Sequence, residues 1–102
     1  MNNYRELVVW QKSMLLVEEV YNVCTKLPSE EKYGLTSQIQ RSAISIPSNI
    51  AEGAVRNSNK EFKHFLSIAN GSCNELNTQL ILINRIGYLQ ENELKHVFEL
   101  LT

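Results

Sequence analysis

Two pairs of residues have a spacing that could bind metal. Glu61 and His64, and likewise Glu93 and His96, are Glu-x-x-His pairs, the spacing that supplies ligands to di-iron sites in ferritin-like bundles. The first pair falls at the start of an expected helix over residues 58–87, and the second falls at the start of the next, over residues 91–102. In an up-and-down bundle the starts of consecutive helices lie at opposite ends, so the two pairs cannot share one metal centre. We therefore expect surface histidines, no metal and no other cofactor.

The remaining composition offers little for catalysis. All 11 acidic residues are glutamates, so the commonest carboxylate ligand of Mg²⁺ and Ca²⁺ loops and every aspartate-based triad are missing. Cys24 and Cys73 fall on apolar stripes and are interpreted as small core residues, with a disulfide or metal pair as the alternative. The net charge of −1 does not favour a strongly basic nucleic-acid-binding domain. We expect a protein that is not an enzyme.

Hydrophobic periodicity predicts four helices, over about residues 4–26, 35–56, 58–87 and 91–102, in one domain that spans 1–102. Ser58 and Glu61 form a capping-box pattern at the third helix, and Pro47 predicts a kink in the second. Short connections favour an all-α, antiparallel up-and-down four-helix bundle with a short fourth helix. The predicted core consists of Trp10, Met14, Ile39, Ile46, Ile50, Leu66, Ala69, Cys73, Leu76 and Leu80.

The first and third helices each carry a second apolar series. In the first helix it comprises Val9, Ser13, Leu16, Val20, Val23 and Leu27, roughly 110° around from the stripe that contains Trp10 and Met14. In the third helix it comprises Phe65, Ile68, Ser72, Glu75, Gln79, Leu82 and Ile86. One interpretation is a wide core face that the fourth helix partly covers. The other is a subunit interface, at Val9, Leu16, Val20, Val23, Phe65, Ile68, Leu82 and Ile86.

Polar residues on the second helix also allow two interpretations. Asn49 and Glu52 share a face with Arg41 and Arg56, either solvated or part of the same interface. The basic residues Arg41, Arg56, Lys60 and Lys63 are either a solvated charged surface or a weak phosphate contact that several subunits would reinforce. Gly71 lies in the middle of the third helix, where close approach of another helix would explain a glycine.

Several segments resemble one protein family. Residues 35–43 (LTSQIQRSA), 45–53 (SIPSNIAEG) and 65–72 (FLSIANGS), together with 9–12 (VWQK) and 86–89 (IGYL), are similar to the four-helix bundle family encoded by intervening sequences of bacterial large-subunit ribosomal RNA genes. The resemblance implies a four-helix bundle that assembles as a homo-oligomer, a pentamer, like the accessory variability protein of diversity-generating retroelements. That relative is strongly basic and binds nucleic acid, whereas this chain is not basic.

These observations predict a non-catalytic, homo-oligomeric scaffold or adaptor in the cytoplasm. The alternative is an accessory protein that binds nucleic acid, RNA or DNA, through a basic patch repeated around the oligomer. The expected partners are further copies of the chain, with nucleic acid or an enzyme that acts on it as the second possibility. We expect no membrane partner and no small-molecule substrate.

Overall fold

The computed structural model describes residues 3–102 of the chain and consists almost entirely of helix. Its α-helices are α1 (Val8–Cys24), α2 (Leu35–Ala54), α3 (Asn59–Ile86) and α4 (Glu91–Leu101), and two short 3-10 helices, η1 (Tyr4–Glu6) and η2 (Ser29–Glu31), precede α1 and α2. The part of the chain that the structure describes contains no strand. None of its helices combines the length and the apolar character needed to cross a membrane. The all-α four-helix bundle is therefore confirmed.

Local sequence signals set the helix ends. The Ser58 side chain accepts a hydrogen bond of 3.2 Å from the Glu61 amide, which satisfies a free donor at the start of α3. Gly87 ends α3 with a φ of 98°, a left-handed conformation that glycine adopts without steric cost. Pro47 lies within α2, which continues from Leu35 to Ala54. The Ser45 hydroxyl, half a turn before Pro47, accepts hydrogen bonds from the side chains of Ser72 and Asn49.

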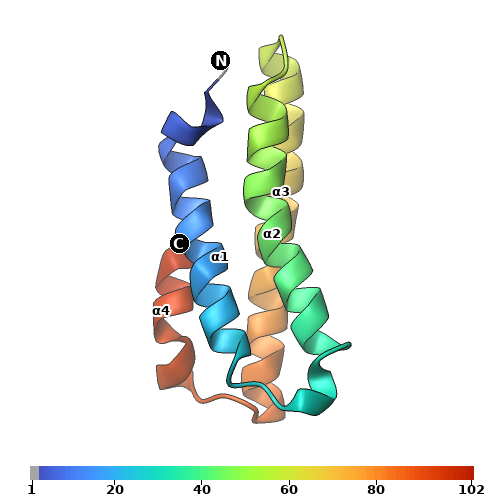
Figure 1. Cartoon of the computed structure of the whole chain (residues 1–102), viewed down its shortest axis with the longest axis vertical. Helices are drawn as coiled ribbons and strands as arrows, with labels where there is room; N and C mark the ends of the chain where they lie inside the picture. The colour runs from blue at the N-terminus through green and yellow to red at the C-terminus, as the bar shows by residue number, and fades with distance from the viewer. Residues whose placement is uncertain (1–2) are drawn as a thin grey trace.

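The helices run along one common direction, with α3 behind α2 and the short α4 beside the lower part of α1 in Figure 1. Among the described residues α1 packs against α2 and α4, α2 packs against α3, and α3 packs against α4, whereas α1 has no close backbone approach to α3. The surface that α1 and α2 form together is called the α1–α2 side, and the surface that α2 and α3 form together is called the α2–α3 side. The end where α2 turns into α3 is the turn end, and α4 starts at the opposite, connector end and reaches about half the height of the bundle.

The core is confirmed for α2 and most of α3. Ile39, Ile50, Leu76 and Leu80 are almost completely inaccessible to solvent, and Ile46 and Ala69 are buried with them. The prediction was wrong for Met14, which is 37% exposed, and Trp10, Leu66 and Cys73 are only half-buried. The face of α1 that does enter the core carries Ser13, Leu16, Val20, Val23 and Cys24.

Hydrogen bonds to Glu31 connect η2, the start of α2 and the turn before α4 at the connector end. The Tyr88 hydroxyl, between α3 and α4, donates a hydrogen bond of 2.8 Å to Oε2 of Glu31 in η2, and the Leu35 amide donates one of 3.1 Å to Oε1. The Tyr88 hydrogen bond, and then the Leu35 amide, lower the pKa of Glu31 because both stabilise its charged form. The same contact with Glu31 raises the pKa of Tyr88. One carboxylate thus caps α2 and ties it to the turn before α4.

Candidate assembly surfaces

The α2–α3 side gathers most of the residues expected at a subunit interface. Ile68, Leu82 and Ile86 of α3 are 40%, 43% and 50% exposed. At about 100° per residue they project within about 40° of one another. Ser72, next to them around the helix, donates a hydrogen bond of 2.9 Å to Ser45 of α2, which places this strip alongside α2. Expected interface residues on the same side are Asn49, Glu52 and Phe65, of which Glu52 is exposed and the other two are half-buried.

The seam between these two helices is a polar groove of about 560 Å³. Its lining consists of Gln38, Arg41, Ser42, Ser45, Glu75 and Gln79. The Oε1 atom of Gln79 is buried there without a hydrogen-bond partner among the described residues. Arg41 and Glu75 are exposed at the groove and make no ion pair with any described part of the chain. This side therefore offers one buried polar atom without a partner in the described chain, and two exposed charged side chains that form no ion pair.

The two glycines within α2 and α3 have opposite surroundings. A Cβ atom on Gly53 would lie 2.7 Å from Cβ of Phe65 and 3.1 Å from Cδ1 of Phe62, so Gly53 lets α2 and α3 approach closely near the turn end. A Cβ atom on Gly71 would meet nothing within 4 Å, and Gly71 is exposed on the outward face of α3. The chain alone gives no packing reason for a mid-helix glycine at Gly71, although such a residue costs about 1 kcal/mol relative to alanine.

The interface expected on α1 was wrong for three of its four residues. Leu16, Val20 and Val23 are 3%, 0% and 1% exposed, because this series faces the bundle interior and not a neighbouring subunit. The alternative interpretation, a wide core face, describes α1 correctly. Only Val9 is on the surface, 47% exposed, at a groove of about 350 Å³ beyond the end of α4.

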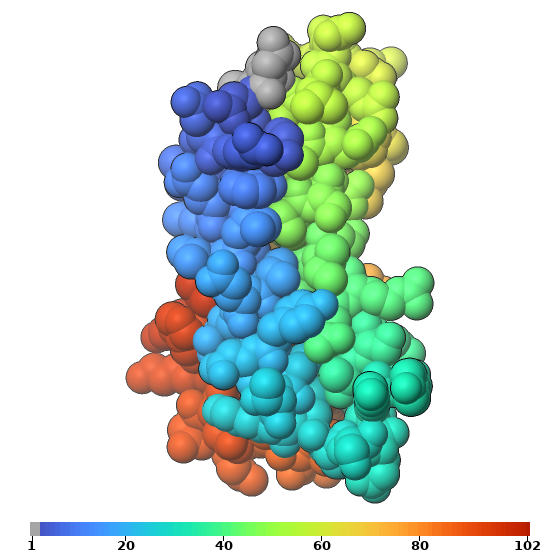
Figure 2. Space-filling view, in the orientation of Figure 1, coloured from blue at the N-terminus to red at the C-terminus, as the bar shows by residue number. Residues whose placement is uncertain are grey.

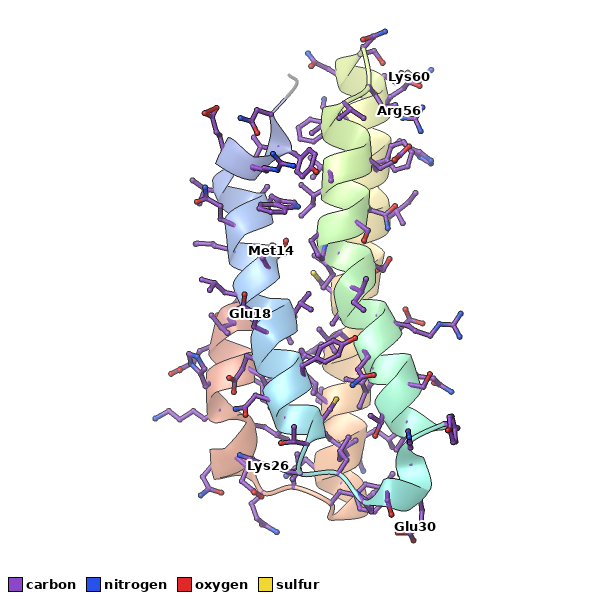
Figure 3. All side chains as sticks on the ribbon, viewed as in Figure 1. Met14, Glu18, Lys26, Glu30, Arg56 and Lys60 are labelled. Carbon is purple, nitrogen blue, oxygen red and sulfur yellow. The ribbon has the colours of Figure 1, made fainter. Side chains whose placement is uncertain are left out.

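A second apolar surface, which the sequence interpretation had assigned to the core, forms the α1–α2 side. A groove of about 320 Å³ runs between the two helices, lined by Tyr4, Trp10, Met14, Val17, Ile44, Pro47, Ser48 and Ala51. Tyr4 and Trp10 pack edge to face, with ring centroids 5.4 Å apart. This side faces the viewer in Figure 2, and Figure 3 shows Met14 upon it. The polar N–H group of Trp10 was the available sequence signal, because a tryptophan whose N–H group lacks a partner prefers a surface position to a dry core.

Three of the four basic residues predicted to contact nucleic acid lie together. Figure 3 shows Arg56 and Lys60 at the turn end, where Lys63 follows in the first turns of α3. Arg56 forms an exposed ion pair with Glu52, and its guanidinium lies 5.1 Å from the centroid of the Phe65 ring. Arg41 lies apart from these three residues, because it precedes Arg56 by about 22 Å along the axis of α2.

The two Glu-x-x-His pairs lie at opposite ends of the bundle, as the up-and-down topology predicts. Glu61 and His64 are in the first two turns of α3 at the turn end, and Glu93 and His96 are in α4 at the connector end. Residues 3–102 contain no group of three or more side chains suited to hold a metal ion. Both cysteines are free, and burial raises the pKa of Cys24 to about 11, so its thiol stays protonated at neutral pH.

Comparison with known proteins identifies the family. The model of the 23S rRNA-intervening sequence protein family matches residues 5–102. The chain belongs to this family. It is also similar to a crystal structure of a protein with unknown function from the S23 ribosomal protein family of Bacteroides thetaiotaomicron. That similarity has a TM-score of 0.84 at 29% sequence identity, over 92% of this chain and 88% of the other. No curated protein matches. The comparisons thus establish family and fold and leave the activity to be inferred from the surfaces.

Proposed function

We propose that this chain is a non-catalytic, homo-oligomeric scaffold or adaptor, a pentamer if it follows the assembly that its resemblance implies. The observation that carries the proposal is the outward face of α3. Ile68, Leu82 and Ile86 expose apolar side chains there, and the same helix has an exposed mid-helix glycine, Gly71, whose missing side chain nothing in the described chain explains. A monomer gains nothing from such a face, whereas a neighbouring subunit would cover it.

Light scattering after size exclusion tests this proposal. The wild-type chain should show several times its 11.7 kDa mass at micromolar concentration. Leu82→Glu should lower the mass without unfolding the bundle, because Leu82 is 43% exposed. Leu15→Glu is the matched control, since Leu15 is 55% exposed on the face of α1 that borders the end of α4. A wild-type chain that remains monomeric over this range would refute the proposal.

The second candidate function is nucleic-acid binding by the assembly. It is favoured by Arg56, Lys60 and Lys63 at the turn end, where a ring of parallel subunits would repeat them around one rim. Such binding is electrostatic, so log affinity should fall linearly with log salt, and Lys60→Glu with Lys63→Glu should abolish it. Binding that survives both reversals would remove the turn end from consideration.

We place the assembly in the cytoplasm, because free thiols suit a reducing compartment. Cys24 and Cys73 are unpaired, and Cys24 is buried where oxidants have little access. Cell fractionation with an antibody against the chain tests this location, and recovery from a secreted or membrane fraction would contradict it.

A further inference from the structure

The polar groove of about 560 Å³ between α2 and α3 carries the groups that a small polar ligand needs. We propose that it binds a free α-amino acid with a polar, uncharged side chain, which is held there and not chemically changed. The carboxylate of the ligand faces Arg41, and its ammonium group faces Glu75. All residues that line the groove belong to one chain, so the inference goes beyond the proposed self-association and does not depend on it.

A hydrogen bond between two serines sets the register of the helices at the groove. The Ser72 hydroxyl of α3 donates a hydrogen bond of 2.9 Å to the Ser45 hydroxyl of α2. The two helices run in opposite directions (Figure 1), so residues before Ser45 and residues after Ser72 both lie towards the connector end. Arg41 precedes Ser45 by four residues, and Glu75 follows the other serine by three. At about 1.5 Å per residue, the two charged residues therefore lie at nearly the same level along the groove.

Arg41 and Glu75 are separated from the other charges on their helices. Each is the only charged residue of its stretch, residues 35–51 on α2 for Arg41 and residues 65–84 on α3 for Glu75. Both side chains are exposed, and neither forms an ion pair with the other or with any further residue that the structure describes. A zwitterion offers each of them the opposite charge, whereas a simple anion or cation would attract one and repel the other.

The neutral polar groups of the groove follow the same division between the helices. On α3, Oε1 of Gln79 lies one turn beyond Glu75 and is buried without a hydrogen-bond partner among the described residues. An ammonium group carries three N–H donors, so a single one serves both the carboxylate and this oxygen. On α2, the Ser45 hydroxyl accepts two hydrogen bonds, and its own proton is donated to no described residue. That proton and the Arg41 guanidinium, one turn away, are suitable donors to a carboxylate.

The lining of the groove also limits the side chain of the ligand. Every lining residue is polar, so no apolar surface is available to cover an aliphatic or aromatic side chain. A charged side chain would find no further unpaired opposite charge there, because Arg41 and Glu75 are engaged by the carboxylate and the ammonium group. Gln38 is exposed at the groove, and its amide both donates and accepts hydrogen bonds. A ligand side chain with an amide group matches it, and L-glutamine is therefore the probe of choice.

Isothermal titration calorimetry of the full chain with L-glutamine tests the site. We expect saturable binding of one ligand per chain, and weaker binding of L-leucine. N-acetyl-L-glutamine lacks the ammonium group and L-glutamine amide lacks the carboxylate, so each should bind about tenfold or more weakly than L-glutamine. Arg41→Gln and Glu75→Gln should cause losses of similar size. Arg85→Gln and Glu18→Gln are the matched controls, because both residues are exposed outside the groove and should leave the affinity unchanged.

A third variant, Gln79→Met, separates a ligand contact from a structural role. The described chain leaves Oε1 of Gln79 without a partner, so its removal should not lower the free energy of unfolding. The same change should weaken the binding of L-glutamine several-fold, because the ammonium group loses one acceptor. Circular dichroism during urea unfolding gives the stability, and calorimetry gives the affinity.

Several outcomes would overturn the inference. A wild-type chain without saturable binding of L-glutamine removes the site, whatever its oligomeric state. Equal affinity for N-acetyl-L-glutamine would reveal an anion contact at Arg41 alone, and equal affinity for L-glutamine amide would reveal a cation contact at Glu75 alone. If both charge variants lowered the stability of the ligand-free chain and left the affinity unchanged, the two residues would form a direct ion pair in solution. Loss of affinity in both variants, with the controls unchanged, supports the site.

Discussion

Two substitutions of the same chemical type, Gly53→Ala and Gly71→Ala, should have opposite effects on the stability of the bundle. Both glycines lie within helices, so alanine gains about 1 kcal/mol of helix propensity at each position. The difference comes from what the added methyl group meets. At Gly71 it meets nothing within 4 Å, and we expect Gly71→Ala to stabilise the folded chain by nearly the full amount.

At Gly53 the added methyl group would collide with α3. It would lie 2.7 Å from Cβ of Phe65, well inside the roughly 3.5–4.0 Å at which two carbon atoms attract. A Cβ atom is fixed to the backbone and cannot rotate away, so α3 must move. Overpacking of this kind costs about 1–3 kcal/mol, which outweighs the gain in propensity. We therefore expect Gly53→Ala to lower the free energy of unfolding by up to about 2 kcal/mol.

Urea unfolding followed by far-ultraviolet circular dichroism measures both effects. The comparison is best made in the Leu82→Glu background, so that association of subunits does not enter the free energies. If Gly53→Ala proved as stable as its parent, the close approach of α2 and α3 near the turn end would be wrong. If Gly71→Ala proved less stable than its parent under those conditions, the open surroundings of Gly71 would be wrong. In the otherwise wild-type chain Gly71→Ala should weaken association, because the added methyl group would project from the face of α3 that the proposed neighbouring subunit covers.

Three further predictions concern the core and the connector end. Leu76→Ala should cost roughly 2–5 kcal/mol of unfolding free energy in the same urea assay, because Leu76 is completely buried, and a loss below about 1 kcal/mol would place it outside the core. Leu16→Glu should prevent folding, seen as loss of the helical circular dichroism signal, whereas a folded variant would contradict the burial of Leu16. The lowered pKa of Glu31 implies that its contribution to stability is present above its unfolded pKa and is lost as the pH falls through the lower folded value. Tyr88→Phe should reduce that acid-side loss in thermal unfolding between about pH 3 and pH 6; an unchanged pH dependence would show that the Tyr88 hydroxyl does not stabilise the charged carboxylate.

Helix positions could be predicted from the sequence because their signals are local. Ser58 caps α3 and Gly87 ends it in the left-handed conformation, and each effect depends on the residue itself and its immediate neighbours. The interior face of α2 was also correct, since Ile39, Ile46 and Ile50 form its single strong apolar stripe and all are buried. A helix with one apolar stripe leaves only one way to face the core.

The orientation of α1 could not be predicted from periodicity alone. It has two apolar stripes roughly 110° apart, and both repeat in threes and fours. The stripe with Leu16, Val20 and Val23 enters the core, and the stripe with Trp10 and Met14 borders α2 at the surface. The choice depends on where α2 and α4 lie around α1, which is a long-range property. The side-chain chemistry was the local signal available, because Leu16, Val20 and Val23 have no polar atom that needs a partner.

The apolar stripe of α1 that was expected at the interface is buried, and the stripe that was expected in the core lies at the surface. This correction alters how self-association and nucleic-acid binding are linked. With Leu16 and Val20 inside the bundle, the expected interface residues that remain exposed lie mainly on α3, and a ring built from head-to-tail contacts keeps all subunits parallel. Parallel subunits collect every turn end on one rim, with Lys60 and Lys63, and every connector end on the other, with Glu91 and Glu93. The rim of turn ends would then repeat Arg56, Lys60 and Lys63, whereas the rim of connector ends would carry basic residues (Lys26, Lys32, Arg85 and Lys95) beside its glutamates. Weak phosphate contacts of single chains add up on such a rim, so the nucleic-acid candidate depends on the ring being intact.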